Sequence, residues 1–344
     1  MDPGSQISAS GRLEPGKSLP ASSPLDERTP PRPAPSPAEA ISSGFSREEL
    51  AVVRRAYARQ RLAILGVDNR GIEAAFAAAP REHFLRPPPW TASSLFGGAL
   101  PCPAQTRSCS TRTWSSPSIR RAASTTRPAL RAKLIEALGP KPGEGIVHVG
   151  AGGGYYSAIL AELVDPAGQV TAVEFDAALA KRAKAFLSGR SNVRVVHDDG
   201  GWPEIPADGV YVNFAVARPA DRWVERPAPG GRLVFPLGIP GPQRPNCGGR
   251  HSDRGAALRI ERRGDAYAAR AISTAYFVCA EGEFEADREE VERLRAAFDA
   301  GGLDTVRSLI WKRPDLPETG WFAGFVSRRS AMSAPDRDGL GRLR

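Results

Sequence analysis

The sequence is poor in the two residue types that build disulfide networks and metal clusters. Its 344 residues include four cysteines and four histidines, and none of them has the spacing of a CxxC or zinc-binding motif. We therefore expect neither a disulfide-rich secreted scaffold nor a metal centre. The chain also lacks a run of about 18 uncharged apolar residues, and its first residues lack the apolar stretch of a secretory signal. These absences predict a cytoplasmic protein that does not enter a membrane.

Acidic residues are absent from a long window between His83 and Ile135. The chain has a formal net charge of +9, and the basic residues of this window account for nearly all of it. They are Arg86, Arg107, Arg112, Arg120, Arg121, Arg127, Arg131 and Lys133. Because the remaining charges nearly balance, a broad basic surface for nucleic acid is not supported. The Arg-rich stretch also contains a single aromatic residue, Trp114, which is too few for base stacking. We expect no nucleic-acid partner.

Composition divides the chain into a folded region and irregular flanks. The N-terminal residues, rich in Pro, Ser and Ala, predict a disordered tail, for which an interaction segment is the alternative. A stretch of Arg, Ser and Thr interrupts the folded region and has neither the helical nor the strand period of apolar residues. The predicted segments are a tail at 1–44, a helical region at 45–100, the aberrant segment at 101–127, a cofactor domain at 128–245, a C-terminal extension at 246–330 and a tail at 331–344.

Local signals predict the first two helices. Ser46 has the spacing of an N-cap with Glu49 as its capping-box partner, and Gly66 ends the amphipathic stretch that follows. A second helix is predicted over 71–79, where Pro80 stops it.

Helices and strands alternate from Pro128 onward, which is typical of a parallel sheet covered by helices. The predicted order is a helix at 128–138, a strand at 146–149, a glycine turn with a helix, a strand at 169–175, a helix at 177–189, and strands within 192–200, 209–217 and 230–238. The extension then predicts a loop at 240–255, a hairpin that turns at Gly264-Asp265, a helix at 287–302 and late strands within 305–311 and 321–327. We therefore predict an α/β, Rossmann-like sheet with helices on both faces, an N-terminal helical segment and a C-terminal hairpin and helix extension.

A glycine turn follows the first of these strands and opens a helix. It reads GAGGGY from Gly150 to Tyr155, a design that brings backbone N–H groups close to a ligand. Tyr155 stands where the dinucleotide fingerprint GxGxxG needs its third glycine, so that fingerprint fails. The spacing of Gly150, Gly152 and Gly154 is instead the GxGxG pattern of S-adenosylmethionine-dependent methyltransferases. A tight turn without a ligand is the alternative.

Acidic residues end the next two strands. Glu174 ends the strand 169–175, where a carboxylate can accept hydrogen bonds from ribose hydroxyls. Asp199 and Gly200 follow the third strand, where a carboxylate can reach an adenine amino group. All three loops lie at the carboxyl ends of parallel strands, where open α/β sheets bind ligands. The alternatives are a solvated strand end for Glu174 and a plain Asp-Gly turn for Asp199.

Two segments resemble the protein-L-isoaspartate O-methyltransferase family. The run APREHF at 79–84 is similar to the family's VPREHF segment, and the block 146–238 has the family's order of glycine turn, ribose acid, Asp-Gly and GGRLVFPLG. The resemblance implies methyl transfer from S-adenosylmethionine to the carboxylate of isoaspartyl residues in damaged proteins or peptides. It implies no metal and no covalent nucleophile, and it assigns no catalytic side chain. The cofactor-binding residues that it implies are Gly150, Ala151, Gly152, Gly154, Tyr155, Glu174, Asp199 and Gly200.

The chain departs from the family pattern at two places. His148 stands where the family usually has an acid before the glycine turn, and a buried structural histidine is an equal alternative there. The family's GQTIS-type segment, which contacts cofactor and substrate, is missing before Pro128. These departures leave open a methyltransferase of the same fold that acts on another protein or a small molecule. They also leave open a catalytically impaired cofactor-binding protein.

A shifted reading frame near 107–127 is our interpretation of the aberrant segment. One permissible GC-rich back-translation, read two bases further on, encodes ILLYQDVVVALDPARGINN, an apolar string with acids and a GINN turn. The shift accounts together for the missing acids, the lost periodicity and the absent substrate loop. A genuine basic insertion is the alternative. If the frame is shifted, we predict that the chain binds the cofactor with weak or no catalysis.

Overall fold

The computed structural model describes residues 46–85, 90–93, 99–102, 113–115, 128–199, 207–243, 249–312, 320–322 and 325–327. All of them belong to the unit Pro35–Arg344. Both predicted tails, Gly200 and most of the aberrant segment lie outside the described residues. The frameshift and the boundaries of the six segments therefore stay predictions.

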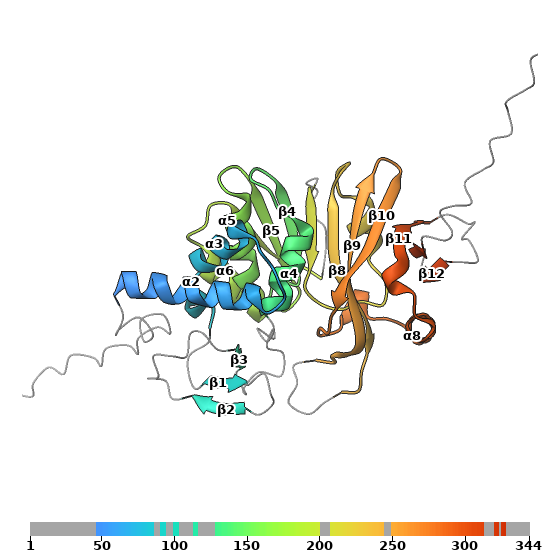
Figure 1. Ribbon diagram of the computed structural model, residues 1–344, viewed down its shortest axis with the longest axis horizontal. Coiled ribbons are helices and arrows are strands. Elements are labelled where there is room, and N and C mark those ends of the chain that lie inside the picture. Colours follow the sequence, from blue (N-terminus) through green and yellow to red (C-terminus); the bar gives the residue numbers. More distant parts are fainter. Residues whose placement is uncertain are drawn as a thin grey trace, which may run out of the picture. The chain divides into compact units, whose positions relative to one another are not determined.

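In the described part of the chain, a ten-stranded sheet has the order β12-β13-β11-β10-β9-β8-β7-β4-β5-β6 (Figure 1). The strands from β8 to β6 in this order are parallel, which confirms the predicted parallel sheet. Because β4 pairs with both β5 and β7, the turn that follows it begins between two neighbouring strand ends. The parallel strands are β4 Gly145–Val149, β5 Gln169–Glu174, β6 Val193–His197, β7 Gly209–Val212 and β8 Arg232–Pro240.

Helices cover both faces of this sheet, as predicted. Successive side chains of β4 point to opposite faces, so Ile146 packs in one apolar core and Val147 in another. The first core includes residues of α2 Arg47–Ala63, α3 Arg70–Ala78, α4 Pro128–Leu138, α5 Tyr155–Val164 and α6 Ala177–Leu187. The second includes residues of α7 Asp221–Glu225, which the sequence did not predict, and of α8 Arg288–Ala300, which it did.

The N-terminal helices form where the sequence predicts them. The Ser46 Oγ atom accepts a hydrogen bond from Glu49 N at 3.1 Å, and the Glu49 carboxylate accepts one from Ser46 N at 2.7 Å. This pair is the predicted capping box at the start of α2. The chain then turns through Gly66, which has a positive φ of 65°.

The APREHF run connects the N-terminal helices to α5 and α6. Its last four residues form the short 3₁₀ helix η1 Arg81–Phe84. The guanidinium carbon of Arg81 lies 5.5 Å from the ring centre of Tyr57 and 5.7 Å from that of Tyr155. The Phe84 carbonyl accepts a hydrogen bond from Arg182 of α6 at 2.6 Å. The run therefore packs the N-terminal helices against the helix that the glycine turn begins.

The C-terminal extension continues the same sheet. Strand β9 Ser252–Arg263 pairs antiparallel with β8 and with β10 Ala266–Thr274, and the hairpin turns at Gly264-Asp265 as predicted. The expected loop at 240–255 is partly wrong, because β9 already begins at Ser252, where its backbone pairs with the end of β8. The remaining 3₁₀ helices are η3 Gly282–Phe284 and η4 Leu303–Thr305.

The late strands match the predicted ranges only in part. Strand β11 Val306–Leu309 lies within the predicted range, but 321–327 is not one strand. It holds two short antiparallel strands, β12 Gly320–Phe322 and β13 Phe325–Ser327.

Three short strands that the sequence did not predict pair in the order β2-β1-β3. They are β1 Trp90–Ser93, β2 Ala99–Cys102 and β3 Thr113–Ser115. Within the described residues, every helix is too short or too polar to cross a bilayer.

Candidate functional site

The glycine turn lies between the end of β4 and the start of α5, as predicted. Gly150, Gly152 and Gly154 have positive φ angles of 76°, 59° and 90°, a conformation that favours glycine. The N–H groups of Gly150 and Ala151 both donate to the Val173 carbonyl, at 2.9 and 3.0 Å, and Gly154 N donates to the Ala151 carbonyl at 3.0 Å. These donors are satisfied inside the fold. The turn thus forms its own hydrogen bonds within the protein, and its contact with a ligand stays a prediction.

Packing fixes the shape of this turn. A Cβ atom at Gly150 would lie 2.6 Å from Cδ1 of Phe214, and one at Gly154 would lie 2.7 Å from Cδ1 of Leu187. Phe214 follows β7, and its ring lies 5.8 Å from Trp223 and 6.2 Å from Phe284, measured between ring centres. Neither glycine has room for a side chain, so the conformation of the turn requires glycine at both positions.

Glu174, at the end of β5, contacts the glycine turn directly. Its Oε2 atom accepts a hydrogen bond from Gly152 N at 2.6 Å, and its Oε1 atom accepts one from Asp176 N at 3.0 Å. Burial raises the pKa of this carboxyl, and the two backbone hydrogen bonds oppose that shift. Glu174 is only 7% exposed, so it is not a solvated strand end. A carboxylate offers about four lone-pair positions, so each oxygen keeps an acceptor position beyond these two bonds.

Asp199 lies at the next strand end and is exposed to solvent. The N–H of Asp198 donates to the Glu174 carbonyl at 3.1 Å, which holds the chain after β6 beside the end of β5. A hydrogen bond with the Asp198 carboxyl raises the pKa of Asp199, and desolvation and the charge of Glu283 add to the shift. Gly200 lies outside the described residues, so its contact with a cofactor stays a prediction.

Two other residues from the predicted site are buried. Ala151 is 3% exposed and Tyr155 is 4% exposed. The ring centre of Tyr155 lies 6.4 Å from that of Phe76 and 5.6 Å from that of Phe84. The structure therefore gives Tyr155 a packing role beside the APREHF run, and its contact with a cofactor stays a prediction.

His148 is a buried histidine one strand position before the end of β4. Its Nδ1 atom lies 2.8 Å from Ser157 Oγ, and its ring centre lies 5.1 Å from that of Tyr211. Burial, followed by the positive charge of Arg131, lowers its pKa to about 3. The side chain is therefore neutral at physiological pH, and it does not replace the negative charge of the acid that the family usually has there.

This shift predicts a specific acid sensitivity. The unfolded chain protonates His148 below its ordinary pKa of about 6.5, whereas the folded chain resists protonation down to about 3. Stability therefore falls as the pH drops through that interval, and His148 alone contributes a loss of about 2 kcal/mol between pH 7 and pH 5. Urea unfolding at both pH values should show a smaller loss for His148→Leu than for the wild type. The exposed His197 supplies the control His197→Gln, which should behave as the wild type, and an unchanged loss in His148→Leu would contradict the prediction.

Sequence reasoning missed two polar residues beside the turn. Asn213 follows β7, and its Nδ2 atom donates to the Gly150 carbonyl at 3.3 Å. Its Oδ1 atom accepts a hydrogen bond from Arg131 Nε of α4 at 3.0 Å. Both residues could have been inferred from the sequence, because Asn213 directly follows an apolar strand and Arg131 lies four residues before the apolar Ile135, on the same helix face.

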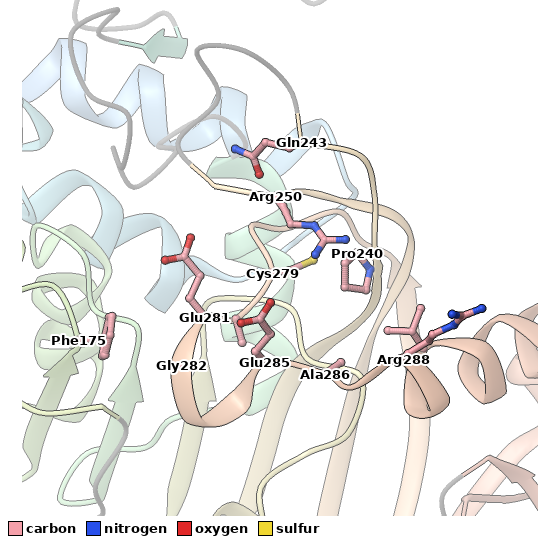
Figure 2. Close-up of a pocket in the computed structure, with 12 residues that line it drawn as sticks. Phe175, Pro240, Gln243, Arg250, Cys279, Glu281, Gly282, Glu285, Ala286 and Arg288 are labelled. Carbon is pink, nitrogen blue, oxygen red and sulfur yellow. The ribbon is translucent and has the colours of Figure 1, made fainter.

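A pocket of about 690 Å³ adjoins the end of β5. Figure 2 shows Phe175, the residue after Glu174, on one side of this pocket and Pro240 on the other. Glu281 and Arg250 add charges of both signs to its lining. The pocket therefore provides a space lined by both apolar and charged side chains next to the strand end that carries Glu174.

Comparisons with known proteins identify the family to which this chain is similar. A family model described as protein-L-isoaspartate(D-aspartate) O-methyltransferase matches residues 66–254, more than half of the chain. A protein-L-isoaspartate O-methyltransferase of Aeropyrum pernix is 44% identical over 119 residues, which are 33% of this chain and 46% of the relative. One from Methylorubrum populi is 37% identical over 142 residues, 40% of this chain and 60% of the relative.

A third relative with the same name, from Methylorubrum extorquens, is 32% identical over 235 residues, which are 65% of this chain and 88% of the relative. The chain thus spans less than two thirds of the Aeropyrum pernix and Methylorubrum populi proteins and most of the Methylorubrum extorquens protein. The region matched by the family model contains the APREHF run, the glycine turn and Glu174. The chain belongs to the protein-L-isoaspartate(D-aspartate) O-methyltransferase family and has its α/β, Rossmann-like fold.

Proposed function

We propose that the protein is an S-adenosylmethionine-dependent methyltransferase that esterifies the free carboxylate of isoaspartyl residues in proteins and peptides. The observation that carries this proposal is the 2.6 Å hydrogen bond from Gly152 N to Glu174 Oε2. It joins the expected ribose acid to the glycine turn, inside the region that the family model matches. The names of the curated relatives support the same substrate.

The residues present fit S-adenosylmethionine. Glu174 keeps an acceptor position on each oxygen for the two ribose hydroxyls. Gly150 is proposed to contribute its backbone to the cofactor site, and the exposed Asp199 is available to an adenine amino group. The other residues proposed to line the cofactor are Ala151, Gly152, Gly154, Tyr155 and Gly200.

The proposed reaction needs positioning more than it needs a catalytic side chain. The bound cofactor supplies an electrophilic methyl group. The accepting carboxylate has a pKa near 4 and is ionised at neutral pH, so it needs no general base. The chain's part is to hold this carboxylate in line with the methyl group and to exclude water. We therefore assign no residue to proton transfer.

We infer further that this chain turns over slowly, because residues 107–127 are read in a shifted frame. Sequencing the DNA that encodes residues 86–131 tests this inference. A base gained near one end and lost near the other would support the shift. One continuous frame would overturn it and make the basic segment a genuine insertion.

The proposed activity is tested with methyl-labelled S-adenosylmethionine and two peptides that differ only in an isoaspartyl or a normal aspartyl linkage. We expect ester formation on the isoaspartyl peptide alone, at a low rate. The rate should rise in a protein whose 107–127 segment is replaced by the shifted-frame sequence. If neither protein methylates either peptide, the proposal of an isoaspartyl substrate is overturned. Cofactor binding without methyl transfer would then favour a catalytically impaired protein or a methyltransferase with another substrate.

The proposal includes a role in protein repair in the cytoplasm. Isoaspartyl linkages arise by spontaneous rearrangement of asparagine and aspartate, so their carriers are damaged proteins.

A further inference from the structure

We propose that Arg131 binds a carboxylate at the methyl-transfer site, an inference that rests on the function proposed above. Arg131 lies in the first turn of α4 and is only 7% exposed. An arginine this deeply buried normally has an anionic partner. Its surroundings therefore show what kind of ligand it can take.

Three segments hold the guanidinium group in place. Its Nε atom donates to Asn213 Oδ1 at 3.0 Å. Its central carbon lies 5.3 Å from the ring centre of Tyr156 and 4.7 Å from that of Phe277. Cation–π contacts of this kind orient a guanidinium and offset part of its desolvation. The contacts leave the two terminal nitrogens as the part of the group that can bind a ligand.

Those terminal nitrogens have no hydrogen-bond partner among the described residues, and no described carboxylate forms an ion pair with Arg131. Burying a positive charge without an anion is costly. The planar N–H fork of arginine matches the two oxygens of a carboxylate. The side chain is thus held ready for a carboxylate that the described protein does not supply.

The position of Arg131 joins it to the glycine turn. Its partner Asn213 also donates to the Gly150 carbonyl at 3.3 Å, and Tyr156 is the second residue of the helix that the turn begins. Asn213 directly follows β7, at the carboxyl ends of the parallel strands. A carboxylate held by Arg131 would therefore lie beside the proposed cofactor site.

Two ligands of the proposed reaction carry such a group. S-adenosylmethionine has an amino-acid carboxylate, and the isoaspartyl substrate has the carboxylate that accepts the methyl group. Both present the same chemistry to the arginine. The experiment must therefore distinguish them by removing one carboxylate at a time.

The test compares the wild type with Arg131→Met, which removes the charge, and with Arg131→Lys, which keeps the charge and loses the fork. Calorimetry measures binding of S-adenosylhomocysteine and of 5′-methylthioadenosine, which lacks the carboxylate. It also measures binding of an isoaspartyl peptide and of the same peptide with that carboxyl amidated, both with S-adenosylhomocysteine present. The exposed Arg270 provides the control Arg270→Met. The lysine variant serves as the second reporter where the methionine variant does not fold.

We expect Arg131→Met to lower the affinity for one of the two carboxylate ligands about 10- to 100-fold. The affinity for the counterpart that lacks this carboxylate should stay unchanged. Arg131→Lys should recover part of the lost affinity. If only S-adenosylhomocysteine loses affinity, Arg131 binds the carboxylate of the cofactor. If only the isoaspartyl peptide loses affinity, Arg131 binds the carboxylate that accepts the methyl group. Unchanged binding of both in the Arg131 variants overturns the inference and leaves the proposed function intact. A wild type that binds neither S-adenosylhomocysteine nor the peptide overturns the proposed function itself.

Discussion

Replacing Glu174 with alanine is expected to weaken S-adenosylmethionine binding by about 100-fold or more. The proposed ribose contacts would lose two charge-assisted hydrogen bonds, each of which contributes about 1.5–3 kcal/mol. The same change leaves Gly152 N and Asp176 N without their acceptor. Calorimetric titration of the variant with S-adenosylhomocysteine measures the loss.

A matched control separates this effect from a general loss of negative charge. Glu162 lies on α5 and forms a surface ion pair with Arg190 at 2.7 Å. Glu162→Ala should bind the cofactor as the wild type does. The isosteric variant Glu174→Gln should lie between the wild type and Glu174→Ala, because it keeps one acceptor oxygen. Wild-type affinity in Glu174→Ala would show that this carboxylate does not hold the ribose.

Replacing Gly150 with alanine is expected to lower the free energy of unfolding by about 3 kcal/mol and to weaken cofactor binding as well. Its φ of 76° is unfavourable for a residue with a side chain. The added Cβ would lie 2.6 Å from Phe214 Cδ1, so the ring or the turn must move. Denaturant unfolding measures the stability, and calorimetry measures the affinity.

Gly153 supplies the control within the same turn. Its φ is not positive, and a Cβ there would approach Arg182 no closer than 4.0 Å. Gly153→Ala should therefore unfold at nearly the same denaturant concentration as the wild type. Equal destabilisation of both variants would contradict the account of the turn, because it would show that neither φ nor Phe214 decides which glycines are needed.

Short-range signals predicted much of the fold. Ser46 and Glu49 form their capping box, and the hairpin turns at Gly264-Asp265, because neighbouring residues determine both features. The contact between Glu174 and Gly152 was also within reach of the sequence, since parallel strands bring their carboxyl ends together.

Long-range packing determined what the sequence could not predict. The direction of the Tyr155 ring depends on Phe76 and Phe84, which lie more than 70 residues earlier in the chain. The contact of Arg131 with Asn213 joins residues 82 positions apart. Strand β9 extends into a segment rich in glycine and polar residues because β8 offers it a partner, which outweighs local propensity.

The account's central claim is that the glycine turn and Glu174 form an S-adenosylmethionine site. Calorimetric titration of the full chain with S-adenosylhomocysteine tests it most directly, because it measures ligand binding at the turn without depending on methyl transfer. The account predicts saturable binding of one ligand per chain, lost in Glu174→Ala and retained in Glu162→Ala. A folded wild-type chain that shows no binding at saturating ligand would contradict it.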